Sequence, residues 1–515
     1  MKLRYKSLTF ASKLFEVLQS SALGGTIIVF SLMLPFLEKH RDVDPDLFAR
    51  VAVGHIIAST GWVAYTDPFS FTAPHATWID HEWLSGYIFF LLSQIGGDFA
   101  LFLFKVLMLF LFLFATTKTH ILVSGKLHLI PYVFSIFFTY YLWLSTVRCQ
   151  IFTYTLLSVF FLLIAQSQQR ISLSKYLLFS LLMVLWTNLH GGFVLGLFFL
   201  GLFWLSRVIE RKSDVVPLGI CLVCTIFLTL CNPYGFSYWQ YMFDALMLPR
   251  TFVPEWDSVS LFSPVGFLMT LTMLIVTHKV VMRERALSFQ SAALIASYLL
   301  GMWHLRLAGI FFIVVSIWGA QEISNFFTLL PHKLRKVRSA LEMLTITLSI
   351  VFGSSSLFSL CCEKDFQLDY SKYPVGATEW LAENAKDTNL LNGFTEGSYL
   401  LWKLAPVIKI SLDGRYEEVY SNEVVDRVRC IYDTTCTSSS EMLLEISPDY
   451  ALVSNKHLKN SKLWDRFGPH SKICYQDEDW TVIKVNATQV SCERPNVGSN
   501  QPTPETLAKM WVRKF

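Results

Sequence analysis

The chain has 515 residues and a formal net charge of +4, and 53% of its residues are hydrophobic while only 16% are charged. This much apolar sequence does not suit a soluble domain, and it predicts a polytopic α-helical membrane protein. The small net charge excludes a strongly basic surface, so we expect no nucleic-acid partner.

Long apolar runs recur from the N-terminal region to residue 360, and most are long enough to cross the hydrocarbon core as helices. We expect about 11 spans, several of them short. They cover 22–37, 99–117, 127–147, 151–165, 176–189, 193–206, 215–230, 265–277, 287–303, 307–318 and 340–360.

Lysine and arginine fall in alternate loops between these spans, and short loops rich in these residues stay in the cytoplasm. The alternation places the remaining loops, and everything after Leu360, outside the cytoplasm. The basic loops hold Lys2, Arg4, Lys6 and Lys13; Lys118 and Lys126; Arg170 and Lys175; Arg207, Arg211 and Lys212; Lys279, Arg283 and Arg285; and Lys333, Arg335, Lys336 and Arg338.

The first outer loop, residues 38–97, is far longer than a connection between spans requires, which is typical of a functional loop. It gathers acidic residues and one histidine at the membrane surface: Asp44, Asp46, Asp67, Asp80, His81 and Glu82. Its last part, 84–95, is apolar but too short to cross, and Gly96 and Gly97 follow it. We interpret this segment as an interfacial helix, with a tilted or re-entrant span as the alternative.

Polar residues also stand at the outward ends of later spans. Taken singly, each has a structural explanation, because such residues cap helix ends or extend to lipid head groups. Their convergence from several loops indicates a functional site instead. The set comprises Arg148, Asn188, His190, Glu255, His304 and Arg306.

Composition changes near Cys361, where the long apolar runs end. We therefore predict a transmembrane domain over 1–361 and an extracytoplasmic α/β domain over 362–515. Asp413-Gly414-Arg415 is typical of a turn at the end of a strand, with its two charges paired. Outside the cytoplasm disulfides are expected, and the candidate pairs are Cys430 with Cys436 and Cys474 with Cys492.

Several motifs resemble the GT-C superfamily of polyprenyl-phosphate-dependent glycosyltransferases, which includes protein O-mannosyltransferases, aminoarabinose transferases and oligosaccharyltransferase catalytic subunits. The segment from Asp44-Pro45-Asp46 to Arg50 resembles the start of the oligosaccharyltransferase loop, and it also looks like the opening of bacterial GT-C-like proteins. The other motifs are Thr66-Asp67-Pro68-Phe69-Ser70, Asp80-His81-Glu82-Trp83-Leu84, Asn188-Leu189-His190-Gly191-Gly192, Asn232-Pro233-Tyr234-Gly235, Tyr399-Leu400-Leu401-Trp402 and Asp413-Gly414-Arg415.

The resemblance implies that Asp44 or Asp46 is the catalytic base, and the sequence does not separate the two. A divalent cation, Mg²⁺ or Mn²⁺, held by both carboxylates would relieve their repulsion, although many members of the superfamily work without metal. Arg306 is the first candidate to bind the lipid phosphate, with His304 as a further donor and Arg148 as the second choice. The remaining candidate substrate-binding residues are Asp67, Asp80, His81, Glu82, Asn188, His190 and Glu255.

We therefore expect a multi-pass protein of the bacterial inner membrane that moves a sugar from a polyprenyl-phosphate donor to a glycan, lipid or protein acceptor outside the cytoplasm. Membrane lipids would surround its spans. Two alternatives stay open: a transporter or flippase, and a non-catalytic envelope assembly protein. A transporter usually places ionisable residues near the bilayer midplane, whereas the charges here stand at span ends.

Overall fold

A computed structural model describes residues 20–73, 77–140, 146–168, 171–248, 253–283, 288–328, 332–363, 366–433, 435–460, 463–486, 496–497, 506 and 509–512. The chain forms two compact units. The helical unit comprises Met1–His40 and Leu103–Asp365, and the mixed unit comprises Arg41–Phe102 and Phe366–Phe515. The basic residues at 2–13, Arg170, Arg285 and Cys492 lie outside the described residues.

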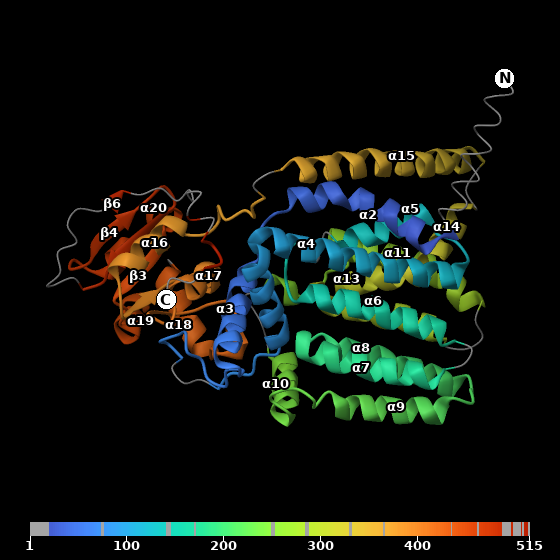
Figure 1. The fold of residues 1–515 in the computed structure, drawn as a ribbon, viewed down its shortest axis with the longest axis horizontal. Helices are drawn as coiled ribbons and strands as arrows, with labels where there is room; N and C mark the ends of the chain where they lie inside the picture. Colours follow the sequence, from blue (N-terminus) through green and yellow to red (C-terminus); the bar gives the residue numbers. More distant parts are fainter. Residues whose placement is uncertain are drawn as a thin grey trace, which may run out of the picture. The chain divides into compact units, whose positions relative to one another are not determined.

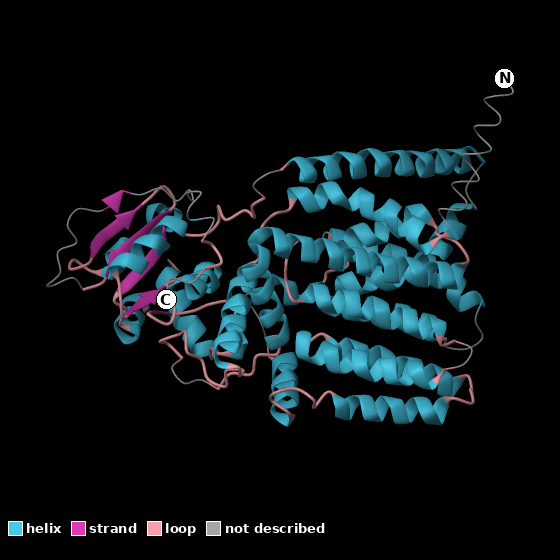
Figure 2. Cartoon of the chain, in the orientation of Figure 1, coloured by secondary structure: helices cyan, strands magenta, loops and turns pink. Residues whose placement is uncertain are grey.

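The helical unit is built from apolar helices connected by short loops, and many of them run side by side (Figures 1 and 2). Helices α2 and α15 pack against each other, as do α7 with α9 and α12 with α13. Helix α4 (Trp83–Ser124) enters this unit from Leu103 onward. The other elements are α2 (Ala22–Lys39), α5 (Leu129–Thr139), α6 (Gln150–Gln166), α7 (Leu173–Leu189), α8 (Phe193–Ile209), α9 (Val215–Leu228), α10 (Phe236–Met247), η2 (Pro254–Trp256), α11 (Pro264–Arg283), α12 (Phe289–Trp303), η3 (Leu305–Leu307), α13 (Ala308–Val314), η4 (Val315–Gly319), α14 (Ala320–Thr328) and α15 (His332–Cys362).

Four helices in the described part of the chain are long and apolar enough to cross a membrane: Ala22–Lys39, Trp83–Ser124, Leu305–Thr328 and Ala340–Cys362. Shorter apolar helices cover Leu129–Thr139, Gln150–Gln166, Leu173–Leu189, Phe193–Ile209, Val215–Leu228, Pro264–Thr277 and Phe289–Trp303. The mostly helical architecture expected from composition is thus present, and the total of about 11 spans stays a prediction.

Helix α4 is broken where the sequence predicts it. Gly96 and Gly97 leave helical geometry, and Gly97 has φ 53°. Positive φ is a conformation that glycine adopts without steric cost. The break therefore separates 83–95 from the long apolar helix that follows it.

The mixed unit contains a six-stranded sheet in the order β2-β1-β3-β5-β4-β6. Strands β2, β1 and β3 are parallel, and β3 pairs with β5 in the antiparallel direction. The strands are β1 (Thr388–Leu391), β2 (Ile408–Ile410), β3 (Tyr450–Ser454), β4 (Lys472–Gln476), β5 (Trp480–Lys484) and β6 (Asn496–Val497). Its helices are α3 (Pro45–Thr60), α16 (Val375–Asn384), α17 (Phe394–Leu404), η5 (Tyr416–Glu418), α18 (Asn422–Tyr432), α19 (Ser439–Ile446), α20 (Asn455–Asn460) and α21 (Leu463–Phe467).

Residues 41–102 fold together with this sheet. The amide of Phe71 donates to the carbonyl of Ile410 at 3.1 Å, and the amide of Ile410 donates to the carbonyl of Phe69 at 3.2 Å. These bonds cover the edge strand β2, which would otherwise expose unpaired backbone groups. Helix α3 packs on α17, where the ring centres of Phe48 and Tyr399 are 5.0 Å apart. The compact unit thus draws on two stretches of sequence, one from the predicted outer loop and one from the predicted C-terminal domain.

Candidate functional site

Helix α3 presents the first polar residues of the site. The side chain of Asp44 caps the helix by accepting from the amide of Asp46 at 3.1 Å, and Pro45 takes the first helical position. Both choices are favourable at a helix start. Asp46 and Arg50 are four residues apart, so they share one face of the helix.

Two glycines allow α3 to approach the start of α4 closely. A Cβ atom on Gly54 would stand 2.3 Å from the carbonyl oxygen of Gly86, and one on Gly86 would stand 2.6 Å from the carbonyl oxygen of Arg50. Neither position has room for a side chain. This close contact fixes the backbone of Arg50 beside the segment that carries Asp80 and Glu82.

Arg50 is buried and binds three carboxylates, and these four side chains form what we call the Arg50 cluster. Its guanidinium lies 2.6 Å from Asp80 Oδ1 and 2.6 Å from Glu82 Oε2, and it also pairs with Glu418. Burial opposes the charge of Arg50, but Glu418, Glu82 and Asp80 raise its pKa well above the usual value. Three carboxylates around one guanidinium leave the cluster with excess negative charge.

His81 adds an imidazole to this negative cluster. Its Nδ1 lies 3.4 Å from Glu418 Oε1, and its Nε2 lies 3.7 Å from Glu82 Oε1. One atom from each of His81, Glu82 and Glu418 lies within 4.8 Å of the others, so the three are placed to hold a metal ion. An imidazole and two carboxylates form a donor set that suits a divalent transition metal such as Mn²⁺.

Asp80 is the most perturbed carboxyl group of the cluster. Its Oδ1 accepts from Arg50 and from the amide of Glu82 at 3.0 Å, whereas its buried Oδ2 has no hydrogen-bond partner. Burial raises the pKa of Asp80 to about 6, because the loss of hydration outweighs the attraction of Arg50. Oδ2 is therefore the oxygen on which a proton would be held.

A second arginine network lies beside the first. Arg415 binds Asp413 with two nitrogens, at 2.9 and 2.7 Å, and Asp67 Oδ1 at 2.6 Å. The hydroxyl of Tyr420 donates to Asp413. Burial raises the pKa of Asp413, but the attraction of Arg415 outweighs this effect, so the pKa lies below its usual value. The predicted pairing of Asp413 with Arg415 is confirmed, and Asp67 joins it from the outer loop.

Trp78 connects the two networks. Its indole N–H donates to Glu418 Oε2 at 3.0 Å, and the guanidinium carbon of Arg415 lies 4.7 Å from its ring centre. Asp46 lies next to the same turn, because a Cβ on Gly414 would stand 2.6 Å from Asp46 Oδ1. The structure therefore brings Asp46, Asp67, Asp80, His81 and Glu82 onto one connected polar region, while Asp44 occupies the cap of α3.

The helical unit has its own cluster, formed by Arg148, Glu255 and Arg306. Arg148 donates to Glu255 Oε1 at 3.1 Å, and Arg306 lies 3.5 Å from Glu255 Oε2. The three side chains are between 19% and 28% exposed, so the cluster is open to solvent or ligand. Two guanidinium groups around one carboxylate leave a net positive charge, which favours an anion.

Helix ends hold this cluster in place. Arg148 precedes α6, Glu255 lies on η2, and Arg306 lies on η3 directly after α12. His304 Nδ1 lies 2.5 Å from the Trp256 carbonyl oxygen, within hydrogen-bond distance. The guanidinium carbon of Arg306 lies over the Trp256 ring, 5.3 Å from its centre. Four of the residues predicted at outward span ends thus converge.

Asn188 and His190 bind helix ends in the same unit. The Asn188 amide donates to the carbonyls of Val184 and Cys231 at 2.8 and 2.9 Å. His190 Nδ1 accepts from the amide of Gly192 at 2.8 Å and lies 2.8 Å from the Thr153 hydroxyl. These contacts describe helix capping, so the predicted substrate contact of either residue stays a prediction.

Sequence reasoning missed Glu418, Trp78 and Tyr420 and gave Arg50 no role beyond its place in a motif. Glu418 binds Arg50 across 368 residues of sequence, a separation for which one sequence carries no signal.

The fold of the chain is similar to that of a solved oligosaccharyltransferase. The particular structures that show it are those of the Archaeoglobus fulgidus oligosaccharyltransferase. Its apo form matches with a TM-score of 0.53 at 10% identity, covering 83% of this chain and 69% of the other. AglB from the same organism, in complex with an inhibitory peptide and a dolichol-phosphate, matches with a TM-score of 0.53 at 11% identity and the same coverage.

At this identity the likeness establishes the fold, and it confirms the resemblance to the GT-C superfamily at that level. The sequence matches no protein-family model, and comparison with curated proteins finds no significant match.

Proposed function

We propose that this chain is a membrane glycosyltransferase that moves a sugar from a polyprenyl-phosphate donor to an acceptor outside the cytoplasm. The observation that carries the proposal is the partly exposed Arg148–Glu255–Arg306 cluster, whose net positive charge suits a lipid phosphate. A similar solved structure holds a dolichol-phosphate, which supports the same ligand class for this chain.

The protein groups divide the chemistry between them. Arg306 and Arg148 bind the phosphate through charge-assisted hydrogen bonds and stabilise the negative charge that grows as the sugar leaves. His304, held beside Arg306 by the Trp256 carbonyl, positions that end of the cluster. Asp44 or Asp46 accepts the proton of the acceptor group.

A divalent cation fits His81, Glu82 and Glu418 by donor type and spacing. When bound, such an ion supplies positive charge that polarises an oxygen ligand. Asp44 and Asp46, the ligands expected from the sequence, are the second candidate set.

Location follows the same reasoning. The disulfide between Cys430 and Cys436 supports an oxidising compartment for the mixed unit, as expected outside the cytoplasm. The four long helices and the shorter apolar ones support a total of about 11 spans. We place the protein in a bacterial inner membrane with the acidic loop and the C-terminal domain on the outer side.

The test measures transfer of labelled sugar from a polyprenyl-phosphate donor in membranes at matched protein level. Arg306→Ala should raise the donor concentration for half-maximal rate about 10- to 100-fold, because it removes a hydrogen-bonded charge. Arg427→Ala, on an exposed surface of α18, is the control and should match wild type. Asp44→Asn and Asp46→Asn should separate the two candidate bases by loss of rate in one of them.

Equal donor dependence in Arg306→Ala and wild type would exclude the phosphate site. Robust transfer in both aspartate variants would exclude the proposed base. Absence of transfer from any polyprenyl-phosphate sugar tested would reject the transferase.

A further inference from the structure

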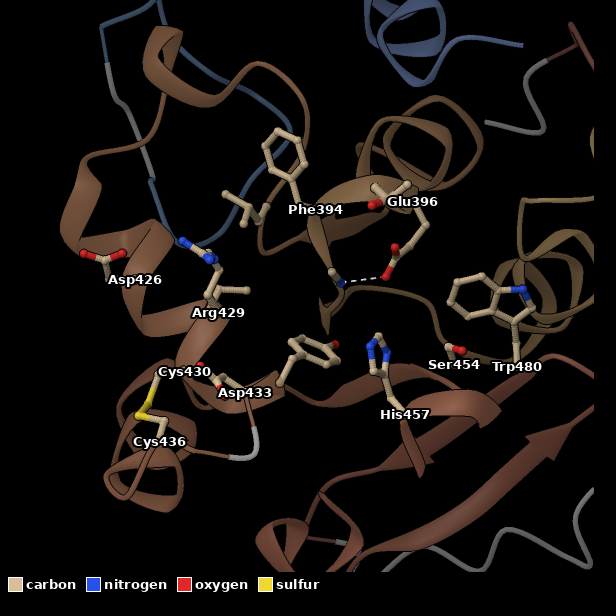
Figure 3. A pocket seen from close by; sticks show the side chains of 15 residues that line it. Phe394, Glu396, Asp426, Arg429, Cys430, Asp433, Cys436, Ser454, His457 and Trp480 are labelled. Carbon is tan, nitrogen blue, oxygen red and sulfur yellow. Dashed lines mark hydrogen bonds between the residues drawn. A yellow bond between two sulfur atoms is a disulfide. The ribbon is translucent and has the colours of Figure 1, made fainter. Parts of the chain in front are cut away.

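The mixed unit holds a cavity of about 540 Å³ that none of the proposed steps uses. Its volume falls in the range of small-ligand sites, roughly 300 to 1,000 Å³. Figure 3 shows Asp426 and Arg429 on one side of it and Trp480 on the other, with His457 and Glu396 between them. All residues that line it belong to the segment between 393 and 480.

The cavity lies at the carboxyl ends of the parallel strands. Gly393 and Phe394 follow β1, Leu412 follows β2, and Ser454 ends β3. In the order β2-β1-β3, the chain leaves β1 toward β2 on one side and later returns to β3 on the other. Crevices at such a reversal of strand order are the usual ligand sites of open α/β sheets.

Charge around the cavity disfavours an anionic ligand. The amide of Gly393, at the start of α17, already donates to Glu396 Oε1 at 2.7 Å, so this helix end is occupied by a carboxylate of the chain. Asp426 and Asp433 add two more carboxylates, against the guanidinium of Arg429 in the lining and that of Arg466, which donates to the Asp433 carbonyl at 2.8 Å. A phosphate would meet repulsion here, whereas hydroxyl groups can donate to carboxylates and accept from Arg429.

Aromatic side chains complete the lining. Phe394 is 37% exposed, and Trp480 is half-buried at the start of β5. The hydroxyl of Tyr432 donates to the Leu452 carbonyl at 3.0 Å, which fixes the orientation of this ring. Apolar ring faces beside a few directed polar groups suit a ligand with both hydroxyl groups and apolar C–H faces.

We infer that this cavity binds a neutral sugar ring of a glycan acceptor. The inference rests on the proposed transferase function, whose acceptor class it names. Direct binding of sugars tests it without relying on transfer.

The experiment titrates the full-length chain in detergent with maltotetraose, mannotetraose and chitotetraose, using saturation-transfer NMR and calorimetry. Inorganic phosphate and tetralysine serve as the anionic and cationic probes. At least one neutral tetrasaccharide should bind, and Trp480→Ala should weaken its binding at least about tenfold, as expected for an aromatic anchor. Trp464→Ala, which removes an exposed tryptophan on α21 that does not line the cavity, is the control and should bind like wild type.

Phe394→Ala provides a second variant if Trp480→Ala lowers the melting temperature, because Phe394 is 37% exposed. The inference is overturned if none of the three tetrasaccharides binds, if only phosphate or tetralysine binds, or if the cavity variants bind like wild type.

Transfer assays on the same preparations separate the two ideas. Sugar binding that depends on Trp480, in a chain that transfers no sugar, would retain the cavity and reject the transferase. Transfer by a chain that binds no neutral sugar would retain the transferase and reject the cavity.

Discussion

Arg415 is held with no exposed surface between two aspartates that come from different parts of the sequence, Asp413 and Asp67. Its guanidinium also lies over the rings of Phe69 and Trp78. A buried charge of this kind is tolerated only while its partners are present. The turn at 413–415 is therefore stable only when the loop segment around Asp67 is in place beside Arg415.

Replacing one partner should expose this dependence. We expect Asp67→Ala to lower the free energy of unfolding by about 3 to 5 kcal/mol, because it leaves part of a buried guanidinium unpaired. Thermal unfolding in detergent measures the loss. Asp42→Ala is the control: its ion pair with Lys372 is exposed, and such pairs contribute about 1 kcal/mol or less. Equal losses in the two variants would contradict the argument.

Asp80 should give the mixed unit a pH-dependent stability. Its pKa in the folded state, about 6, lies above that of an unfolded aspartate, so the folded state binds the proton more tightly. The stabilising contribution is complete below about pH 4 and is lost as the pH rises to about 6. Asp80→Asn should remove it, so the difference in melting temperature between wild type and variant should change across this window and stay constant above it. A difference independent of pH would refute the assignment.

At the scale of elements, the contact between α3 and α4 sets the position of Arg50. Because a Cβ on Gly54 has no room against Gly86, Gly54→Ala should push the helices apart and cost about 1 to 3 kcal/mol. Gly201→Ala in α8 is the control, since a Cβ there meets no atom within 4 Å. Melting temperatures of both variants check the expectation, and an unchanged Gly54→Ala protein would show that the close approach is dispensable.

Elements were predictable from sequence where their signal is local. The apolar helices, the break at Gly96 and Gly97 and the strand-ending turn before Arg415 all follow from patterns within a few residues. The cluster of Arg148, Glu255 and Arg306 was also predictable, because charge alternation assigns each of their loops to the same side.

Contacts between distant segments were not predictable in this way. The pairing of Ser70 with Ile410, which adds the loop to the sheet edge, joins two segments far apart in the sequence, and neither segment carries a pattern that identifies the other as its partner. Arg50 had seven acidic residues within its own loop, 38–97, as local candidates, and nothing in the sequence favoured Glu418. The helix α10, amphipathic and short, also gave no span signal.

At the scale of the whole molecule, the mixed unit is discontinuous in sequence. We expect residues 366–515 alone to lack a cooperative thermal transition, or to melt at least about 10 °C lower than a chain that joins 41–102 to 366–515 through a Gly/Ser linker. The loop supplies Asp67 to the buried Arg415 and covers the edge of β2. Circular dichroism in mild detergent measures both transitions. Equal melting of the two chains would mean that the loop is not part of the folding unit.

The division of this unit also fixes an order of events during biosynthesis. Residues 41–102 leave the ribosome before the roughly 260 residues of the helical unit that separate them from Phe366. At about 5 to 20 residues per second, that interval lasts on the order of 10 to 50 s. During this time Glu418 and Arg415 have not been made, so Arg50 and Asp67 lack these partners. The newly made loop must be protected from aggregation and cleavage until the C-terminal part of the chain is synthesised.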